Sequence, residues 1–382
     1  MIEMKESDLK LLNKYFDHKL SIQNNNLIID DIERFIKTIP EILYESKLTN
    51  TDYIKALLFV TYSAALQSGI KFSSFHQLYK AVGCGEIISK FSFPVIDIEN
   101  NSFEHNCLLF GAMRDSDAHL VGLQLTCLDD ALKTRLKIAK IIAAALMEKY
   151  SGPLFLVSQD IFFHAIEFES DRVGEIEKAQ NLVKSAIDSC IFNLNIDASE
   201  LVDQNKVDVS ERMLMNLKMV AMSINIWIRM YEPKGLTVSV GGKISRTNNS
   251  MTTEKELGDF IKRLLKEGLR LRFNTPGEDI CKVTVQTDQI DKLEEYKKLD
   301  MVAKTELKAG GIVLPLGELN NLKLIQEISG LGICELQFKL VESLMKIDKL
   351  KELFNYLGVS SSKDVYLRYI QELKEILDFS SF

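Results

Sequence analysis

The chain has 382 residues, of which 46% are hydrophobic and 26% charged, and its formal net charge is −7. This composition is typical of a globular protein, and the length favours one large domain with a smaller one. An acidic chain without a long basic run is not expected to bind nucleic acid or an anionic membrane surface.

The polar start, MIEMKESDLK, does not suit a secretory signal, and the longest apolar run, 141–147, is too short to cross a bilayer. The six cysteines are scattered and form no Cys-x-x-Cys pair, which excludes a zinc-ribbon or redox motif. They predict buried, reduced thiols. We therefore expect a cytoplasmic protein.

The first 90 residues have helical spacing and no clear strand alternation, for example in IERFIKTIPEILYES and YIKALLFVTYSAALQSG. They predict a helical extension over residues 1–90, packed on the outside of the domain that follows. At the other end, residues 359–382 predict one more amphipathic helix.

Between these segments, short apolar runs alternate with longer amphipathic stretches. The expected strands are 93–98, 119–125, 152–158, 191–197, 236–240, 282–287, 310–315 and 332–338. Strands that alternate with helices favour a parallel sheet of right-handed βαβ units. Eight strands in about 250 residues predict an α/β fold, a closed (β/α)8 TIM barrel over residues 91–358. Thr253 and Glu256 form the pattern of a capping box before one of the helices.

In such a barrel the functional residues lie at the carboxyl ends of the strands and in the loops after them. The residues expected there are Gln159, Asp160, His164, Asp197, Ser199, Lys243, Ser245, Arg246, Gln286, Thr287, Asp288, Ala309, Gly310, Gly311 and Gln337.

Several stretches resemble segments of a known protein family, both in their sequence and in their order along the chain. They are LYKAVGCGEIISKFSFPVIDI (78–98), GPLFLVSQD (152–160), NLNIDASELVD (193–203) and VSVGGKI (238–244), with looser matches in VQTD (285–288), AGGIVLP (309–315) and ICELQF (333–338). Over about residues 78–345 the chain resembles the class II fructose-bisphosphate aldolase family, in particular its larger bacterial members with an N-terminal helical extension. The resemblance implies a TIM barrel with a zinc ion held by three histidines, an acid/base aspartate after the third strand, an acidic segment on the fifth and a glycine-lined phosphate site.

The sequence departs from that pattern at most of these positions. Gln159 and Asp160 stand at the family's Asp-His pair, and Gly241 and Lys243 stand where acidic residues are expected. Ala309 replaces the histidine before Gly310 and Gly311, and Gln337 is the matching residue on the eighth strand, whereas Asp197 and Ser199 are retained. The whole chain has five histidines, of which only His164 lies near a strand's carboxyl end. We therefore expect no three-histidine zinc site within one chain, and no metal or cofactor.

Two interpretations of the remaining residues stay open. Lys243 is either a Schiff-base lysine or the partner of Asp160 or Asp197 in a salt bridge that replaces the charge of the lost metal, and we expect the salt bridge. Asp160, Asp197 and Asp288 are either ligands of a hard cation or hydrogen-bonded loop residues, and we expect the latter.

The expected phosphate-binding residues are Ser199, Ser245, Arg246, Gly310 and Gly311, although the two glycines are equally explained by close backbone packing. His164 is either an acid/base or a surface residue that supports the site.

Two hypotheses follow. The first is a class II aldolase-like barrel that has lost zinc-dependent chemistry and serves as a binding or assembly protein, as a homo-oligomer or paired with an active relative, with retained sugar-phosphate binding. The second is an active aldolase, lyase or epimerase on a phosphorylated sugar, with catalysis rebuilt on Lys243, Asp160, Asp197 and His164. A zinc aldolase whose ligands come from a neighbouring chain is not expected.

Overall fold

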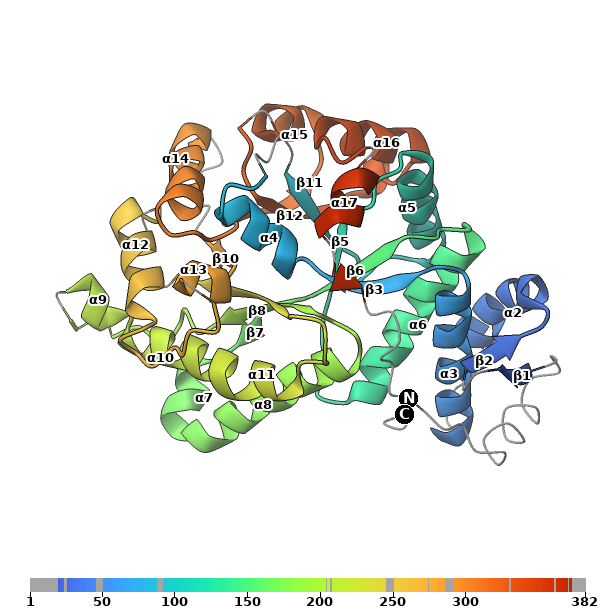
Figure 1. The fold of residues 1–382 in the computed structure, drawn as a ribbon, viewed down its shortest axis with the longest axis horizontal. Helices are drawn as coiled ribbons and strands as arrows, with labels where there is room; N and C mark the ends of the chain where they lie inside the picture. The colour runs from blue at the N-terminus through green and yellow to red at the C-terminus, as the bar shows by residue number, and fades with distance from the viewer. Residues whose placement is uncertain are drawn as a thin grey trace.

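Eight parallel strands close into a barrel, and helices surround it (Figure 1). The computed structural model describes residues 20–23, 26–45, 51–87, 92–203, 205–206, 208–244, 251–273, 275–285, 292–329, 331–360, 362–369 and 371–372. The barrel strands are β4 (Phe93–Asp97), β5 (Gly122–Leu125), β6 (Pro153–Ser158), β8 (Asn193–Asp197), β9 (Ser239–Lys243), β10 (Lys282–Thr284), β11 (Ile312–Leu319) and β12 (Glu335–Leu340). The predicted (β/α)8 barrel is confirmed.

The strands are connected by helices that form the outer layer. They are α5 (Phe103–Asp115), α6 (Ala131–Met147), α7 (Ala165–Ser170), α8 (Arg172–Asp188), α9 (Val209–Arg212), α10 (Leu214–Met222), the π-helix η1 (Ser223–Ile228), α11 (Arg229–Tyr231), α12 (Glu254–Arg263), α13 (Pro276–Asp279), α14 (Leu293–Thr305), α15 (Leu322–Ser329), the 3₁₀-helix η2 (Glu342–Leu344) and α16 (Ile347–Tyr356). The predicted capping box of α12 is present, since the Glu256 backbone donates to Thr253 and the Thr253 backbone donates to Glu256.

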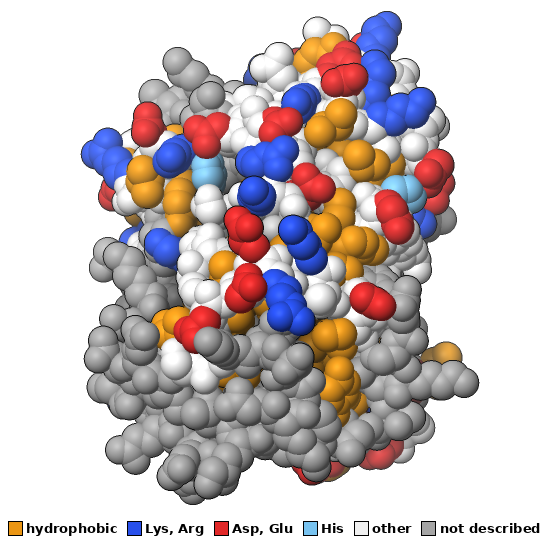
Figure 2. Space-filling view, turned by 90° about the vertical axis from the view of Figure 1, so that its right-hand side faces the viewer, with side chains coloured by type: hydrophobic (Ala, Val, Ile, Leu, Met, Phe, Trp, Pro, Cys, Tyr) orange, Lys and Arg blue, Asp and Glu red, His pale blue; other side chains and the backbone are white. Residues whose placement is uncertain are grey.

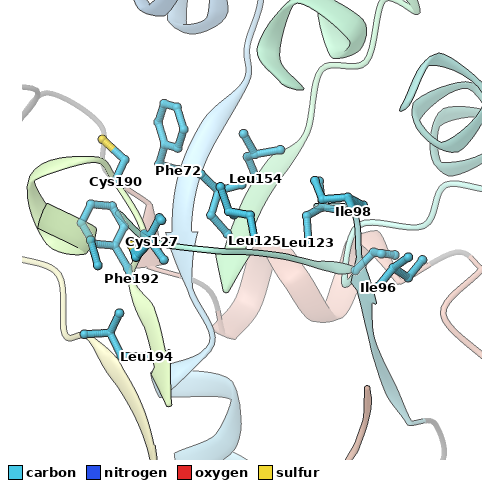
Figure 3. Close-up of a cluster of buried hydrophobic side chains, with 14 of the residues drawn as sticks. Phe72, Ile96, Ile98, Leu123, Leu125, Cys127, Leu154, Cys190, Phe192 and Leu194 are labelled. Carbon is cyan, nitrogen blue, oxygen red and sulfur yellow. The ribbon is translucent and has the colours of Figure 1, made fainter. Parts of the chain in front are cut away.

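The main core lies between the barrel wall and these helices. Alternate residues of each strand point outward, so that Ile96 of β4, Leu123 of β5 and Leu154 of β6 are buried in one cluster (Figure 3). Burying one such side chain stabilises the fold by about 1.5–3 kcal/mol. This layer therefore holds the strands in register independently of what the barrel encloses.

The amino end of the barrel is closed by a separate aromatic cluster. The helix α4 (His76–Gly83), which Phe75 directly precedes, lies inside the ring of helices in Figure 1. The rings of Phe75 and Phe155 stack with centroids 4.0 Å apart, and Tyr79 meets Phe93 edge-on at 5.6 Å. Because side chains fill this end, a candidate site is sought at the opposite, carboxyl end.

The ring closes between β6 and β8, where Val157 pairs with Asn193. Nearer the amino end, a further strand, β3 (Lys71–Ser74), pairs with the start of β6. The Asn193 side chain crosses this junction: its Oδ1 accepts the Phe75 N–H at 2.8 Å, and its Nδ2 donates to the carbonyls of Ser73 and Leu156. One buried amide thus satisfies backbone groups that the diverging strands leave unpaired.

The N-terminal segment is less uniformly helical than predicted. It contains α2 (Ile32–Glu45) and α3 (Thr51–Gln67), which both contact α6 on the outside of the barrel. It also contains β3 and an antiparallel hairpin of β1 (Leu20–Gln23) and β2 (Asn26–Ile29), so the expectation of helices alone is wrong. Strands of four residues are too short to give a recognisable alternation in the sequence.

The C-terminal helix is also shorter than predicted. The helix α17 (Lys363–Tyr369) is followed by β13 (Gln371–Glu372), which pairs antiparallel with β3. The unpaired edge of β3 offers backbone hydrogen bonds that compete with continuation of the helix. Residues 373–382 lie outside the described part of the chain.

Other expectations concern the surface and the thiols. All six cysteines are free, and Cys127, Cys190, Cys281 and Cys334 are buried, but Cys84 is exposed, contrary to prediction. Within the described ranges, no helix has the length and apolarity needed to cross a membrane. On the face shown in Figure 2, acidic and basic side chains are interspersed, with hydrophobic side chains between them.

Candidate functional site

Three charged side chains meet at the carboxyl ends of β6, β8 and β9. The Lys243 Nζ lies 2.6 Å from Oδ2 of Asp197 and 3.2 Å from Oδ2 of Asp160. The predicted salt bridge of Lys243 is therefore confirmed, and it is made to both aspartates. We call Asp160, Asp197 and Lys243 the mouth triad.

Strand register explains why the three residues meet. Ile196 of β8 pairs with Gly242 of β9, so the next residues, Asp197 and Lys243, lie side by side and point the same way. After β6 the chain enters the short strand β7 (Ile161–Phe162), which pairs with the end of β8. Asp160, the residue before β7, is thereby brought next to Asp197.

The triad has two carboxylates for one ammonium group. Burial opposes the charge on Lys243, but the combined effect of Asp160 and Asp197 is larger and raises its pKa above the ordinary value of 10.5. Burial raises the pKa of Asp160, the Lys243 charge lowers it in part, and the nearby Asp197 raises it further. Lys243 is therefore protonated at neutral pH, whereas Schiff-base formation needs the neutral amine.

The two aspartates differ in their surroundings. Asp197 is buried, and its second oxygen, Oδ1, accepts the Ser199 N–H at 2.9 Å. The side chains of Asp160 and Lys243 are 19% and 35% exposed, so solvent reaches the triad from their side. Both Asp197 oxygens are occupied, and the retained Ser199 takes part through its backbone.

His164 lies on the same rim but does not join the triad. It precedes α7, its backbone N–H donates to Glu175, and its Nδ1 is 3.8 Å from a carboxylate oxygen of Glu200. The Phe162 ring lies next to both groups: its centroid is 5.7 Å from that of His164 and 5.6 Å from the Lys243 Nζ. His164 is thus directed at Glu200 on the surface rather than at Asp160 or Asp197.

The described residues at the mouth do not fit a zinc ion. Asp160 and Asp197 are the two carboxylates that meet there beside Lys243, and both already bind its ammonium group. A divalent cation on the same oxygens would lie within a few ångströms of that positive charge and be repelled by it. Zinc sites are instead built from neutral imidazoles, thiolates and free carboxylates.

The structure does not bring Gly310 and Gly311 to the mouth. They precede β11 and therefore lie at the amino end of the barrel, where the Gly310 N–H donates to the Cys281 carbonyl at 2.7 Å. A Cβ on Gly310 would lie 2.5 Å from Cβ of Tyr79 in α4. Close packing against α4 accounts for this glycine, and a phosphate site that joins the glycines to Lys243 is excluded by their position.

Other candidates fall outside the site or outside the described residues. Gln159 accepts a hydrogen bond from Thr126 at 2.7 Å, and the buried Gln337 donates to Glu335 at 2.8 Å. Ser245, Arg246 and the segment Gln286 to Asp288 lie outside the described part of the chain.

A second charged cluster lies deeper in the barrel and was not predicted. Lys282 of β10 and Glu335 of β12 are both fully buried, with the Lys282 Nζ 2.8 Å and 3.0 Å from the two carboxylate oxygens. Tyr79 of α4 donates a short hydrogen bond to the same carboxylate. Burial and the Glu335 charge raise the pKa of Tyr79 well above its usual value, so its hydroxyl remains a donor.

Gly241 makes room for this cluster. Asn195, Gly241 and Lys282 occupy matching positions on β8, β9 and β10. A Cβ on Gly241 would lie 2.8 Å from Asn195 Oδ1 and 3.1 Å from Lys282 Cε. Neither polar atom of the buried Asn195 side chain has a hydrogen-bond partner among the residues that the structure describes. The first glycine of Gly-Gly-Lys thus accommodates a polar layer directly below the triad.

One sequence signal could have revealed this layer. Lys282 and Glu335 each stand at the start of an otherwise mainly apolar strand, in CKVTV and CELQF, with opposite charges. A buried charge is rarely tolerated without an opposite charge beside it. The presence of Lys282 in one apolar strand and Glu335 in another therefore indicates that the two form an ion pair.

Comparisons with known proteins do not assign a family. No family model and no curated protein matches the chain. Among solved structures, the chain is similar to a probable tagatose 6 phosphate kinase from Sinorhizobium meliloti 1021, with 11% identity and a TM-score of 0.44. The match covers 65% of this chain and 64% of that chain, so this chain spans less than two thirds of that protein.

The crowding at Gly241 predicts opposite effects for two glycine substitutions. Gly241→Ala forces Asn195 or Lys282 to move and should destabilise the protein by about 1–3 kcal/mol. The matched control is Gly258→Ala in α12, where a Cβ meets nothing within 4 Å. It should stabilise by about 0.5–1 kcal/mol through helix propensity. Chemical denaturation measures both, and equal effects would contradict the described packing.

The buried pair predicts strong coupling between Lys282 and Glu335. Lys282→Met leaves the Glu335 charge unpaired and should cost about 3–5 kcal/mol. The double variant Lys282→Met/Glu335→Gln removes both charges, so its cost should fall short of the sum of the single costs by about 1–3 kcal/mol. The control cycle on the exposed pair Lys323 and Glu327 should give less than about 0.5 kcal/mol. Additive costs at the buried pair would contradict the ion pair.

The triad predicts a raised pKa for Lys243 that depends on both aspartates. Competitive labelling of amines as a function of pH should place it above 10.5 in the wild type, and Asp160→Asn and Asp197→Asn should each lower it. Because the folded pKa is the higher one, the triad stabilises the fold below the unfolded lysine pKa, and this stabilisation is lost as pH rises through the folded pKa. The stability difference between wild type and Lys243→Met should therefore shrink at strongly alkaline pH. An ordinary pKa of Lys243 in the wild type would contradict this description of the triad.

Proposed function

We propose that the chain is a class II aldolase-like barrel protein that has lost aldol chemistry and acts as a binding or assembly protein. The observation that carries the proposal is the mouth triad, in which Lys243 binds both Asp160 and Asp197. These two aspartates are thereby engaged in holding an internal cation.

The electrostatics of the triad support the loss of catalysis. A general base needs a free lone pair near the reacting atom, and a Schiff-base lysine needs a neutral amine. The carboxylates are bound to an ammonium, and the raised pKa of Lys243 keeps that ammonium charged. Each catalytic role thus requires breaking the salt bridge first.

Exposed apolar side chains near the mouth support a role in assembly. Ile166 on α7 and Val173 on α8 are 80% and 65% exposed, and Phe162 before them is 39% exposed. A partner that covers such groups removes their apolar surface from water, which favours association. We propose a second copy of this chain or an active aldolase-like relative as the partner, in the cytoplasm, with no resident metal or cofactor.

Retained sugar-phosphate binding is part of the proposal. The Ser199 region at the end of β8, with Ser245 and Arg246 after β9, would supply the phosphate ligands. The Gly310–Gly311 segment is not part of this site.

One observation favours the alternative, an enzyme rebuilt on Lys243, Asp160 and Asp197. Lys243 is within hydrogen-bond reach of two acids and is partly open to solvent. A ligand that displaced the lysine from Asp160 would free a carboxylate for acid/base work on a phosphorylated sugar. This candidate predicts turnover that depends on all three residues.

The two candidates separate in an aldol-cleavage assay. Purified protein with fructose 1,6-bisphosphate, with and without added zinc, should give no turnover above buffer, and borohydride should trap no ketose phosphate on Lys243. The reason is that both the acids and the amine are engaged in the salt bridge. Turnover that is lost in Lys243→Met and in Asp160→Asn would replace the binding proposal by the enzyme. The same variants serve as the control for a contaminating aldolase, whose turnover they would leave unchanged.

A further inference from the structure

The helical layer on one side of the barrel exposes apolar side chains at both of its ends. The first group is Phe162, Ile166 and Val173, described above for assembly. The second group, with side chains between 41% and 63% exposed, consists of Ile226, Met230, Leu265 and Leu271. Exposed apolar residues that are grouped mark interaction surfaces, whereas single ones are ordinary.

Carboxylates surround the first group. Glu167 and Glu169 of α7 and Glu177 of α8 are exposed, and none of them forms an ion pair with a residue that the structure describes. The basic residues of the same stretch are engaged: Arg172 lies over an aromatic ring, and Lys178 pairs with a buried carboxylate. We call the first apolar group together with these three carboxylates the acidic patch.

Basic side chains surround the second group. The stretch 262–272 contains five basic residues and one acidic residue. Lys262, Lys266 and Arg270 are exposed, and they form no ion pair within the described part of the chain. We call the second apolar group together with these three residues the basic patch.

Hydrogen bonds hold the two segments of the basic patch together. Asn225 of η1 donates from Nδ2 to the Gly268 carbonyl at 2.7 Å and accepts the Arg270 N–H at 3.0 Å. One turn later, Arg229 of α11 donates to the Arg270 carbonyl at 2.5 Å. The loop after α12 is therefore fixed against η1 and α11, which places the two exposed segments next to each other.

The two patches lie at opposite ends of the same side of the barrel. The helices α8 and α11 contact each other and lie together in the lower part of Figure 1, and Gln180 of α8 donates to the Tyr231 hydroxyl of α11 at 2.9 Å. The acidic patch is at the start of α8, which follows β7 at the carboxyl end. The basic patch precedes β9 and β10 and is therefore at the amino end. A face with opposite charges at its two ends is complementary to itself under a two-fold rotation.

We propose that two copies of this chain associate through this side, with the acidic patch of each copy on the basic patch of the other. The proposal rests on the assembly role in the proposed function and extends it by naming the partner as a second copy. The apolar centres of both contacts are removed from water, and the charges around them select the arrangement. Two acidic patches facing each other would repel, so the contact of a patch with itself is disfavoured.

Sedimentation velocity of the full chain tests the proposal by an exchange of charges. Glu167→Lys/Glu177→Lys reverses most of the charge of the acidic patch, and Lys266→Glu/Arg270→Glu reverses most of the charge of the basic patch. For each variant alone the dissociation constant should rise about tenfold or more, because like charges then meet in both contacts. An equimolar mixture should recover association, since both contacts of a mixed dimer then join opposite charges.

The apolar part of the interface has a matched control. Ile166→Asp places a charge at the centre of the acidic patch and should raise the dissociation constant about tenfold or more. Met301→Asp changes another exposed apolar residue, on α14 outside both patches, and should leave the dissociation constant unchanged. Circular dichroism should show the wild-type fold for every variant.

Two results would overturn the proposal. The first is a wild-type chain that stays monomeric across the concentration series. The second is a wild-type dimer that the charge variants do not weaken, or that their mixture does not restore. Neither result restores aldol chemistry or removes a relative as partner, so the proposed function is judged separately by the aldol-cleavage assay.

Discussion

The barrel encloses charges, and each has to be matched by an opposite charge within reach. Lys243 with Asp160 and Asp197 does this at the mouth, and Lys282 with Glu335 does it one layer deeper. Pairs of this kind add little net stability over a well-packed apolar core, but breaking one leaves a buried charge that the fold tolerates poorly. The strand register, the small residue at Gly241 and the position of α4 through Tyr79 are all tied to these pairs.

The barrel itself could be predicted from the sequence, because each strand is a short apolar run bounded by a longer amphipathic one. The salt bridge of Lys243 could also be predicted, since a lone lysine at a strand end needs a carboxylate and neighbouring strand ends supply two. The deeper pair was harder to locate. Lys282 and Glu335 stand out as charges in mainly apolar strands, but pairing them requires knowing that β10 and β12 lie on either side of β11 in the barrel. Gly310 and Gly311 were expected at the mouth, but a residue that precedes a parallel strand lies at the opposite end from one that follows it.

The mouth of this barrel combines a widespread scaffold with an unusual internal cation. The acids at the carboxyl ends of β6 and β8 are the kind of residues that bind metals or move protons in such folds. A single lysine at the end of β9 engages both. Beside the triad, the Thr126 hydroxyl donates to Gln159 and the Thr126 N–H donates to Glu99, so hydrogen bonds also link the ends of neighbouring strands there.

The closure between β6 and β8 has a mechanical consequence. The strands β11 and β12 pair from Val313 to Leu319 with one irregularity between Pro315 and Gly317. In contrast, β6 and β8 share the single pair Val157 and Asn193, and β3 lies alongside the start of β6. The Asn193 amide of β8 links this strand to β6 and to Phe75. One side chain thus makes hydrogen bonds across the junction that backbone groups make between other neighbouring strands. In local opening of the native state, the cylinder should therefore part along this line first, with the opposite wall still intact.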